Sequence, residues 1–296
     1  MAGQVPVRRR LVGGALRRYR ENVGYTLEDA AGVLECDRSK ISRIETGQRG
    51  VRPKELRELL AEYGVGESEQ HALAAIAGRG SRHAWWRRHA DVMSETCLDY
   101  VIVESAASEI MTYEAQVIPD LLQTDDYARA MAAALPGVQD GQHAESVVAA
   151  KAARRRAVLG EGTSQAAAGG NGGPKEPLRL GVVLGEGALH QAVGGSAVMD
   201  GQLRHLAAVG AEYPAVTIQV LPFSAGAHAA AGSGSLAILR FCDAPSLGVV
   251  YLETLSGGVF LDSGEAVARY LRAFALLRAA ALSPADSAAL LRSLSA

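Results

Sequence analysis

The first 65 residues carry apolar side chains at helical spacing in four short groups, and this pattern constrains the fold most strongly. Residues three or four positions apart lie on one face of a helix, so each group predicts one helix with a buried stripe. The groups span Val12–Val23, Leu27–Leu34, Ile41–Ile44 and Leu56–Tyr63. A fifth helix over Ser68–Ala77 would close the bundle.

The breaks between these groups hold residues that begin and end helices. Thr26 and Asp37 can cap the second and third helices, because their side-chain oxygens accept hydrogen bonds from free amides. Gly24 and Gly47 suit the left-handed position that follows a helix, and Pro53 suits the first turn of the fourth helix. The sequence therefore predicts an all-helical N-terminal domain over residues 8–78.

The second and third helices have the spacing of a helix-turn-helix. Ala31 stands 10 residues before Ile41, and its small side chain lets the next helix pack across it. Ile41 and Ile44 face the core, which turns a polar face outward that holds Arg38, Ser39, Ser42 and Arg43. Such a face suits DNA, because helix N-termini attract phosphate and arginine pairs with guanine.

Three segments resemble the phage-repressor (Xre) helix-turn-helix family: Thr-Leu-Glu-Asp-Ala-Ala at 26–31, Arg-Ser-Lys-Ile-Ser-Arg-Ile-Glu-Thr-Gly at 38–47, and Arg-Pro-Lys-Glu-Leu at 52–56. The resemblance implies base-reading by Arg38, Ser39 and Arg43. It implies contacts to the DNA backbone by Lys40, Arg52 and Lys54. It also implies a structural ion pair between Arg20 and Glu45 that orients the third helix.

Two residues depart from the family pattern. Leu27 stands where the family often has a glutamine that touches phosphate, so one expected DNA contact is missing. Glu35 stands where the turn usually has glycine, so a non-glycine residue occupies a position that often prefers a positive φ.

Charge and length place the DNA-binding function at the N-terminal end of a two-domain chain. The first 60 residues hold 13 Lys and Arg against 8 Asp and Glu, whereas the remaining 236 hold 17 against 24. A length of 296 residues predicts about two domains, and 48% hydrophobic with 21% charged residues is ordinary globular composition. We expect a bacterial protein of the cytoplasm, because high Ala, Gly and Arg content is typical of GC-rich genomes and no apolar run could span a membrane.

Residues 79–296 predict an α+β regulatory or partner-binding domain. Strands are expected over 178–184, 216–221, 236–241 and 248–254, and helices over 125–134, 144–158, 198–209 and 265–281, with a short one from Pro284. The stretch 98–111 mixes both spacings, and we interpret this region as mostly helix. The Gly-rich insert at 160–177 is expected to be flexible.

The segments 117–129, 193–199, 219–228 and 251–253 resemble antitoxin-like Xre regulators with a large C-terminal domain of unknown biochemical role. The resemblance implies a transcriptional regulator whose C-terminal half senses a ligand or a small partner protein, often encoded nearby. A rival interpretation is an antitoxin-like protein-interaction module that binds such a partner and represses mainly its own gene.

Enzyme interpretations find little support in the sequence. Ser233, His228 and Asp243 could form a catalytic triad, but Ser233 lies in a Gly-Ser turn without a nucleophile elbow. Gly185-Glu186-Gly187 has His190 in place of the third glycine of a dinucleotide fingerprint. Histidine spacing predicts no zinc site, and the three cysteines, Cys36, Cys97 and Cys242, are expected to be buried free thiols. We therefore expect no catalysis, no metal and no cofactor.

Three further features have two interpretations each. His228 lies in a long glycine-rich loop and is a candidate ligand or partner residue, although a solvated loop histidine is the commoner case. Trp85 and Trp86 could form a partner patch or pack between domains. The run Arg154–Arg156 could extend the DNA surface or form a solvated helix face.

The sequence as a whole predicts a sequence-specific DNA-binding regulator. A single helix-turn-helix reads few bases, so we expect a homodimer on a pseudo-palindromic operator with half-sites about one helical turn apart.

Overall fold

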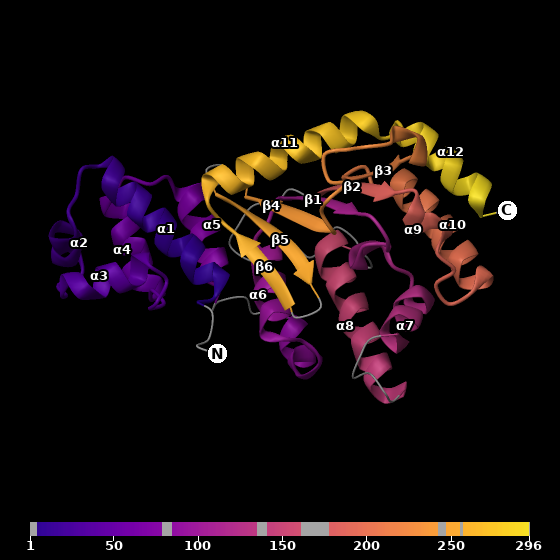
Figure 1. Ribbon diagram of the computed structural model, residues 1–296. Coiled ribbons are helices and arrows are strands. Elements are labelled where there is room, and N and C mark those ends of the chain that lie inside the picture. Colours follow the sequence, from indigo (N-terminus) through magenta and orange to yellow (C-terminus); the bar gives the residue numbers. More distant parts are fainter. Residues whose placement is uncertain are drawn as a thin grey trace.

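Two architectures share the chain in the computed structural model, which describes residues 5–78, 85–134, 141–160, 178–241, 247–254 and 257–295. Figure 1 shows a group of helices at one end and a sheet flanked by helices at the other. The predicted fold class, an all-α helix-turn-helix region followed by an α+β domain, is confirmed. Most of the predicted insert at 160–177 lies outside the described residues.

The N-terminal helices are α1 (Val7–Asn22), α2 (Leu27–Val33), α3 (Arg38–Glu45), α4 (Pro53–Glu62) and α5 (Glu67–Ala77). Thr26 caps α2 through a reciprocal pair of hydrogen bonds: its hydroxyl accepts from the Asp29 amide, and the Asp29 carboxylate accepts from the Thr26 amide. Asp37 precedes α3 in extended backbone but its side chain accepts no capping hydrogen bond, so the prediction for Asp37 is wrong in that detail.

The turn between α2 and α3 is strained at one residue. Glu35 has φ of +46°, and it is the one non-glycine residue in the described ranges with a positive φ. Its neighbour Cys36 donates its amide to the Ala31 carbonyl at 3.0 Å, which closes the turn. The chain therefore adopts a positive φ in this turn without a glycine, at a cost of about 1 kcal/mol.

Six strands form one mixed sheet in the order β3-β2-β1-β4-β5-β6. They are β1 (Glu109–Glu114), β2 (Arg179–Gly185), β3 (Val216–Leu221), β4 (Leu236–Arg240), β5 (Gly248–Thr254) and β6 (Gly257–Leu261). Strands β1 to β3 pair in parallel, and β4 to β6 continue from β1 as an antiparallel meander. The central strand β1 begins inside the stretch 98–111, so the interpretation of that stretch as mostly helix is wrong for residues 109–111.

Helices cover both faces of this sheet (Figure 1). They are α6 (Glu95–Glu104), α7 (Asp125–Ala133), α8 (Gly141–Leu159), α9 (Gly187–His190), α10 (Ser196–Glu212), α11 (Gly264–Ala280) and α12 (Pro284–Leu294), with 3-10 turns η1 (Trp85–Val92), η2 (Asp120–Leu122) and η3 (Phe223–Ala225). One face buries Phe274 and Leu277 of α11 against Val183 and Val250. The opposite face buries a larger cluster beneath α6 and α10.

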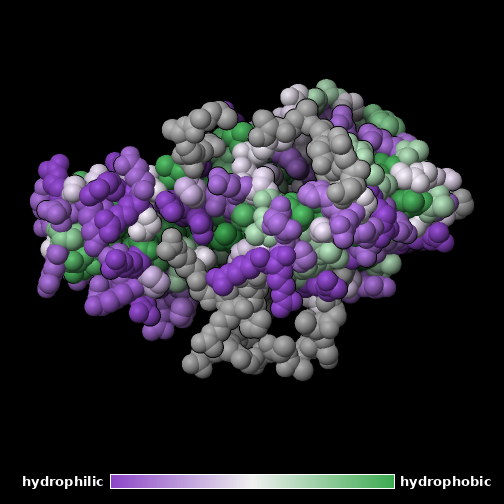
Figure 2. Space-filling view, turned by 90° about the horizontal axis from the view of Figure 1, so that it is seen from below, coloured by the Kyte–Doolittle hydropathy of each residue, from purple (hydrophilic) through white to green (hydrophobic). Residues whose placement is uncertain are grey.

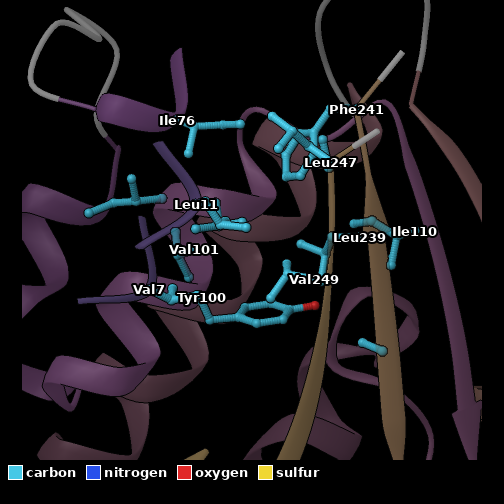
Figure 3. Packing of buried hydrophobic residues seen from close by; sticks show 14 of the residues in the cluster. Val7, Leu11, Ile76, Tyr100, Val101, Ile110, Leu239, Phe241, Leu247 and Val249 are labelled. Atoms are coloured by element: carbon cyan, nitrogen blue, oxygen red, sulfur yellow. The ribbon is translucent and has the colours of Figure 1, made fainter. Parts of the chain in front are cut away.

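This larger cluster continues into the N-terminal helices. Figure 3 shows Val7 and Leu11 of α1 and Ile76 of α5 packed with Val101 of α6, and beyond them Val249 of β5. Polar contacts reinforce the junction: the Asp99 carboxylate accepts from the Val7 amide at 3.0 Å, and Arg10 pairs with Asp262 at 3.1 Å. The helix-turn-helix is therefore fixed to the sheet domain by a shared core.

The basic run on α8 forms internal ion pairs. Both carboxylate oxygens of Glu104 accept from Arg154 at 2.8 Å, and Asp120 accepts from the same guanidinium at 3.2 Å. Arg155 donates to Asp125 at 3.2 Å. Arg154 and Arg155 therefore form neither part of an open DNA-binding surface nor a solvated helix face. Both side chains are largely buried and pair with carboxylates of neighbouring elements.

No single helix in the described ranges is long and apolar enough to cross a membrane. Taken together, α11 and α12 meet the same test of length and composition, but they meet at an angle of 65°. Cys36 and Cys97 are free thiols, partly rather than fully buried, and Cys242 lies outside the described residues.

Glu114 at the end of β1 makes stability depend on pH. Burial raises its pKa from 4.5 to about 7, and the nearby carboxylates of Glu253 and Asp120 add to the shift against the hydrogen bonds from Ser235 and Thr112. Between these two pH values the folded chain holds a proton that the unfolded chain releases. The contribution of Glu114 to the free energy of unfolding is therefore fully present below pH 4.5 and is lost as the pH rises through about 7.

We predict that Glu114→Gln, which keeps the shape without the charge, stabilises the protein by up to about 3 kcal/mol near pH 8 and by much less near pH 5. Urea unfolding at both pH values measures the difference. Glu265→Gln, at an exposed pair with Arg269, is the matched control and should leave the pH dependence unchanged. An equal effect of Glu114→Gln at both pH values would contradict the assignment.

Candidate nucleic-acid interface

Helix α3 exposes one polar face to solvent, and its opposite face is packed in the core of the helical bundle. Ile41 and Ile44 are 1% and 2% exposed, and Ala31 of α2 is buried beside them. The polar face leaves Arg38, Ser39 and Arg43 exposed. Figure 2 shows that strongly hydrophilic side chains cover much of this end of the molecule. The structure therefore brings the three predicted base-reading residues together on one open surface.

The two arginines of this face lie along the protein surface in the free chain. Arg38 donates to the Glu28 carboxylate of α2 at 2.9 Å, and both side chains are more than half exposed. Arg43 donates to the Ser39 carbonyl at 3.1 Å and to the Ser39 hydroxyl at 3.4 Å. Exposed contacts of this kind contribute about 0–1 kcal/mol, so DNA can replace them at small cost.

Lys40 differs from the other predicted DNA-contacting residues. Its ammonium donates to the Glu55 carboxylate at 2.8 Å, and its side chain is only 18% exposed. The same carboxylate accepts from the Arg52 amide at 3.0 Å and so caps α4. Burial alone would raise the pKa of Glu55, but these hydrogen bonds outweigh it and lower the pKa. Lys40 therefore ties α3 to the start of α4, and its predicted contact with a DNA phosphate stays a prediction.

The loop between α3 and α4 supplies exposed cations. Arg52 and Lys54 are exposed, and the Glu58 carboxylate lies 3.5 Å from the Lys54 ammonium. Sequence reasoning missed Arg49, which is also exposed and lies in the same loop. Its backbone amide donates to the Arg43 carbonyl at 2.9 Å, which fixes this loop to the C-terminal end of α3. The sequence did offer a signal for Arg49, because it lies only three residues before Arg52, a residue already predicted to contact DNA.

A buried ion pair fixes the orientation of α3 relative to α1. Arg20 donates to both carboxylate oxygens of Glu45, at 2.7 and 3.0 Å, and to the Tyr25 carbonyl at 2.7 Å. The two paired side chains are 9% and 6% exposed, and the hydrogen bond to Glu45 raises the pKa of Arg20. This is the pair that the resemblance implied.

Helices α1 and α3 also approach each other closely at Gly13. A Cβ at this position would lie 2.3 Å from the Ile44 carbonyl oxygen, so only glycine fits. The ion pair and this contact together leave α3 little freedom to rotate.

Comparison with known families agrees with this division of the chain. Residues 11–73 match the model of a helix-turn-helix domain, HTH_31, and residues 97–293 match a domain of unknown function, DUF5753. The second match covers two thirds of the chain. The chain belongs to the DUF5753 family. No curated protein and no solved structure matches this chain. The first match covers α3 and its supporting helices, which indicates a helix-turn-helix DNA-binding regulator.

The other candidate residues lie in the DUF5753 domain or beside it. The His228 ring packs edge-on against Tyr113, and its Nδ1 accepts from the Ala230 amide at 3.3 Å. Ser233 is exposed in the same loop, whereas Asp243 lies outside the described residues. Among the residues that the structure describes, no group of three or more His, Cys, Asp or Glu could hold a metal ion.

The two tryptophans favour the packing interpretation. Trp86 is 9% exposed and belongs to the large core cluster, and Trp85 packs edge-on against it with ring centroids 6.1 Å apart. A surface patch therefore cannot include Trp86, while Trp85 stays half-buried.

We predict that Arg20→Ala destabilises the protein by about 3–5 kcal/mol, because it leaves the Glu45 carboxylate buried without a partner. Arg17→Ala on the same helix is the control: its pair with Glu21 is exposed, so the loss should be at most about 1 kcal/mol. Urea unfolding measures both. Similar losses of unfolding free energy in the two variants would show that the buried pair contributes no more to stability than an exposed one.

Proposed function

We propose that this DUF5753 protein is a sequence-specific transcriptional regulator of the phage-repressor (Xre) type. The supporting observation is the exposed face of α3, which is held from behind by the Arg20–Glu45 and Lys40–Glu55 pairs. In this proposal Arg38, Ser39 and Arg43 read base edges in the major groove. Arg49, Arg52 and Lys54 hold backbone phosphates and supply the salt-dependent part of the affinity.

The proposal includes a homodimer on a pseudo-palindromic operator. Helix α3 has only 8 residues, and its exposed face reaches few base pairs. A second copy related by two-fold symmetry doubles the sequence that is read, with half-sites about one helical turn apart. In a cell the protein would act in the cytoplasm, on the nucleoid.

The DUF5753 domain serves, in this proposal, as the regulatory half. Helices α6 and α1 pack in one shared core, so a shift of α6 would displace α1. Arg10 of α1 also pairs with Asp262, which follows β6. A ligand or a small partner protein bound to the sheet domain would thereby alter the support of α3. The antitoxin-like alternative, in which partner binding is the main function, finds support in the exposed Phe223 ring, which stacks on His190. A small protein that copurifies and needs Phe223 would favour that alternative.

Selection from a random-sequence duplex library tests the main proposal. Purified full-length protein is incubated with the library at ~150 mM salt, which suppresses background held by charge alone. Enrichment of one palindromic motif supports sequence-specific regulation. Recovery of DNA without any shared motif would contradict it.

On the selected operator, we predict that Arg43→Ala weakens binding by about 1–3 kcal/mol and relaxes the preference at one base position. Lys54→Ala, the matched control, should weaken operator and random DNA alike and reduce the dependence on salt by about one phosphate contact. Fluorescence anisotropy titrations over a range of salt concentrations measure both. Equal losses on operator and random DNA for Arg43→Ala would refute the base-reading role.

A further inference from the structure

A cavity of about 380 Å³ lies behind the α3–α4 loop, between that loop, the start of α1 and the end of α5. Its size falls within the range of small-molecule sites, about 300–1,000 Å³. The face that recognises DNA lies on the other side of α3, so the cavity does not belong to the base-reading surface. Behind the cavity lies the packed core of Val12, Ile44 and Leu56, each at most 3% exposed, so the apolar surface that a ligand can reach comes from Val51, Pro53, Ala74 and Ala77.

Four arginines surround this apolar surface: Arg8, Arg9, Arg49 and Arg52. No Asp or Glu is among the described residues that line the cavity. Arg8 lies 3.5 Å from Asp99, but Arg9 and Arg49 form no ion pair within the described part of the chain. The cavity wall therefore carries positive charge that is only partly neutralised, by the Asp99 carboxylate near Arg8 and Arg9.

The guanidinium of Arg9 reaches across to the loop. A Cβ at Gly50 would lie 3.7 Å from Arg9 Nε, which places this group beside the backbone that joins Arg49 to Val51. Guanidinium groups bind carboxylate and phosphate with two parallel hydrogen bonds, and two of them on one wall suit a single anionic group. An apolar surface with a cationic rim is complementary to a molecule with an apolar body and an anionic head.

We propose that this cavity is a binding site for an amphipathic anion, whose apolar body lies on Val51, Pro53 and Ala77 and whose carboxylate or phosphate pairs with Arg9 and Arg49. The ligand would also regulate DNA binding, a part that rests on the proposed function. Arg52 lines the cavity and belongs to the predicted backbone contacts, so an anion in the cavity competes with DNA for it.

Isothermal titration calorimetry on the full-length protein, without DNA, tests the site. The probes are octanoate and octyl phosphate, which distinguish the two head groups, and 1-octanol is the uncharged control. We expect saturable binding of at least one anion, at least about tenfold tighter than that of 1-octanol. Equal binding of 1-octanol, or no saturable binding of either anion, would overturn the proposal.

Two kinds of variant separate charge from shape. Arg9→Gln combined with Arg49→Gln should weaken anion binding at least about tenfold. Ala74→Phe keeps every charge but fills the cavity from the exposed side of α5, and it should abolish binding. Arg17→Gln, on α1 outside the cavity, should bind the probe like the natural chain. Circular dichroism checks that each variant is folded. Undiminished binding by Ala74→Phe would overturn the location.

The regulatory part is measured on the selected operator. A saturating anionic probe should weaken DNA binding by about fivefold or more in the natural chain and leave Ala74→Phe unchanged. Anion binding with unaltered operator affinity would overturn the coupling. If the protein did not bind DNA at all, the calorimetric test of the anion site would still stand. Failure of the proposed DNA-binding function is therefore distinguishable from failure of the anion site.

Discussion

Helix α1 packs against α3 on one side and α6 on the other, and both halves of the molecule depend on this arrangement. At Gly13 the backbones of α1 and α3 are in direct contact, and Arg20 holds Glu45 in a buried pair. On the opposite side Val7 and Leu11 enter the core that continues to the sheet. A helix fixed at both sides transmits strain in either direction, because close-packed interiors deform little. The position of α3 is therefore set by the whole chain and not by the helix-turn-helix alone.

Burial separates the basic residues of the N-terminal region into two groups. Arg20 and Lys40 are nearly enclosed and pair with Glu45 and Glu55, so removing them from these partners is expensive. Arg38, Arg43 and Lys54 form only exposed contacts, which DNA can replace. The same residue types therefore support α3 in one group and remain accessible at the surface in the other.

Local signals allowed much of the fold to be predicted. The reciprocal capping of Thr26 and Asp29, and the strands at 216–221 and 248–254, follow from residues close together in the chain. Strand β1 was missed because its sequence, Glu-Ile-Met-Thr-Tyr-Glu, follows the end of α6 after only four residues and carries charge at both ends. The roles of Lys40 and Arg154 could not be predicted, since their partners Glu55 and Glu104 lie on other elements. Pairing of this kind depends on tertiary packing, which residue spacing does not reveal.

Methylation interference on the selected operator tests most directly whether α3 reads the major groove through arginine. Dimethyl sulfate modifies guanine N7 in the major groove and adenine N3 in the minor groove. We predict that methylation of a guanine N7 in each half-site blocks binding of the natural chain, and that Arg43→Ala or Arg38→Ala loses this sensitivity at one position. Interference confined to adenine N3, or guanine sensitivity retained by both variants, would contradict major-groove recognition by α3.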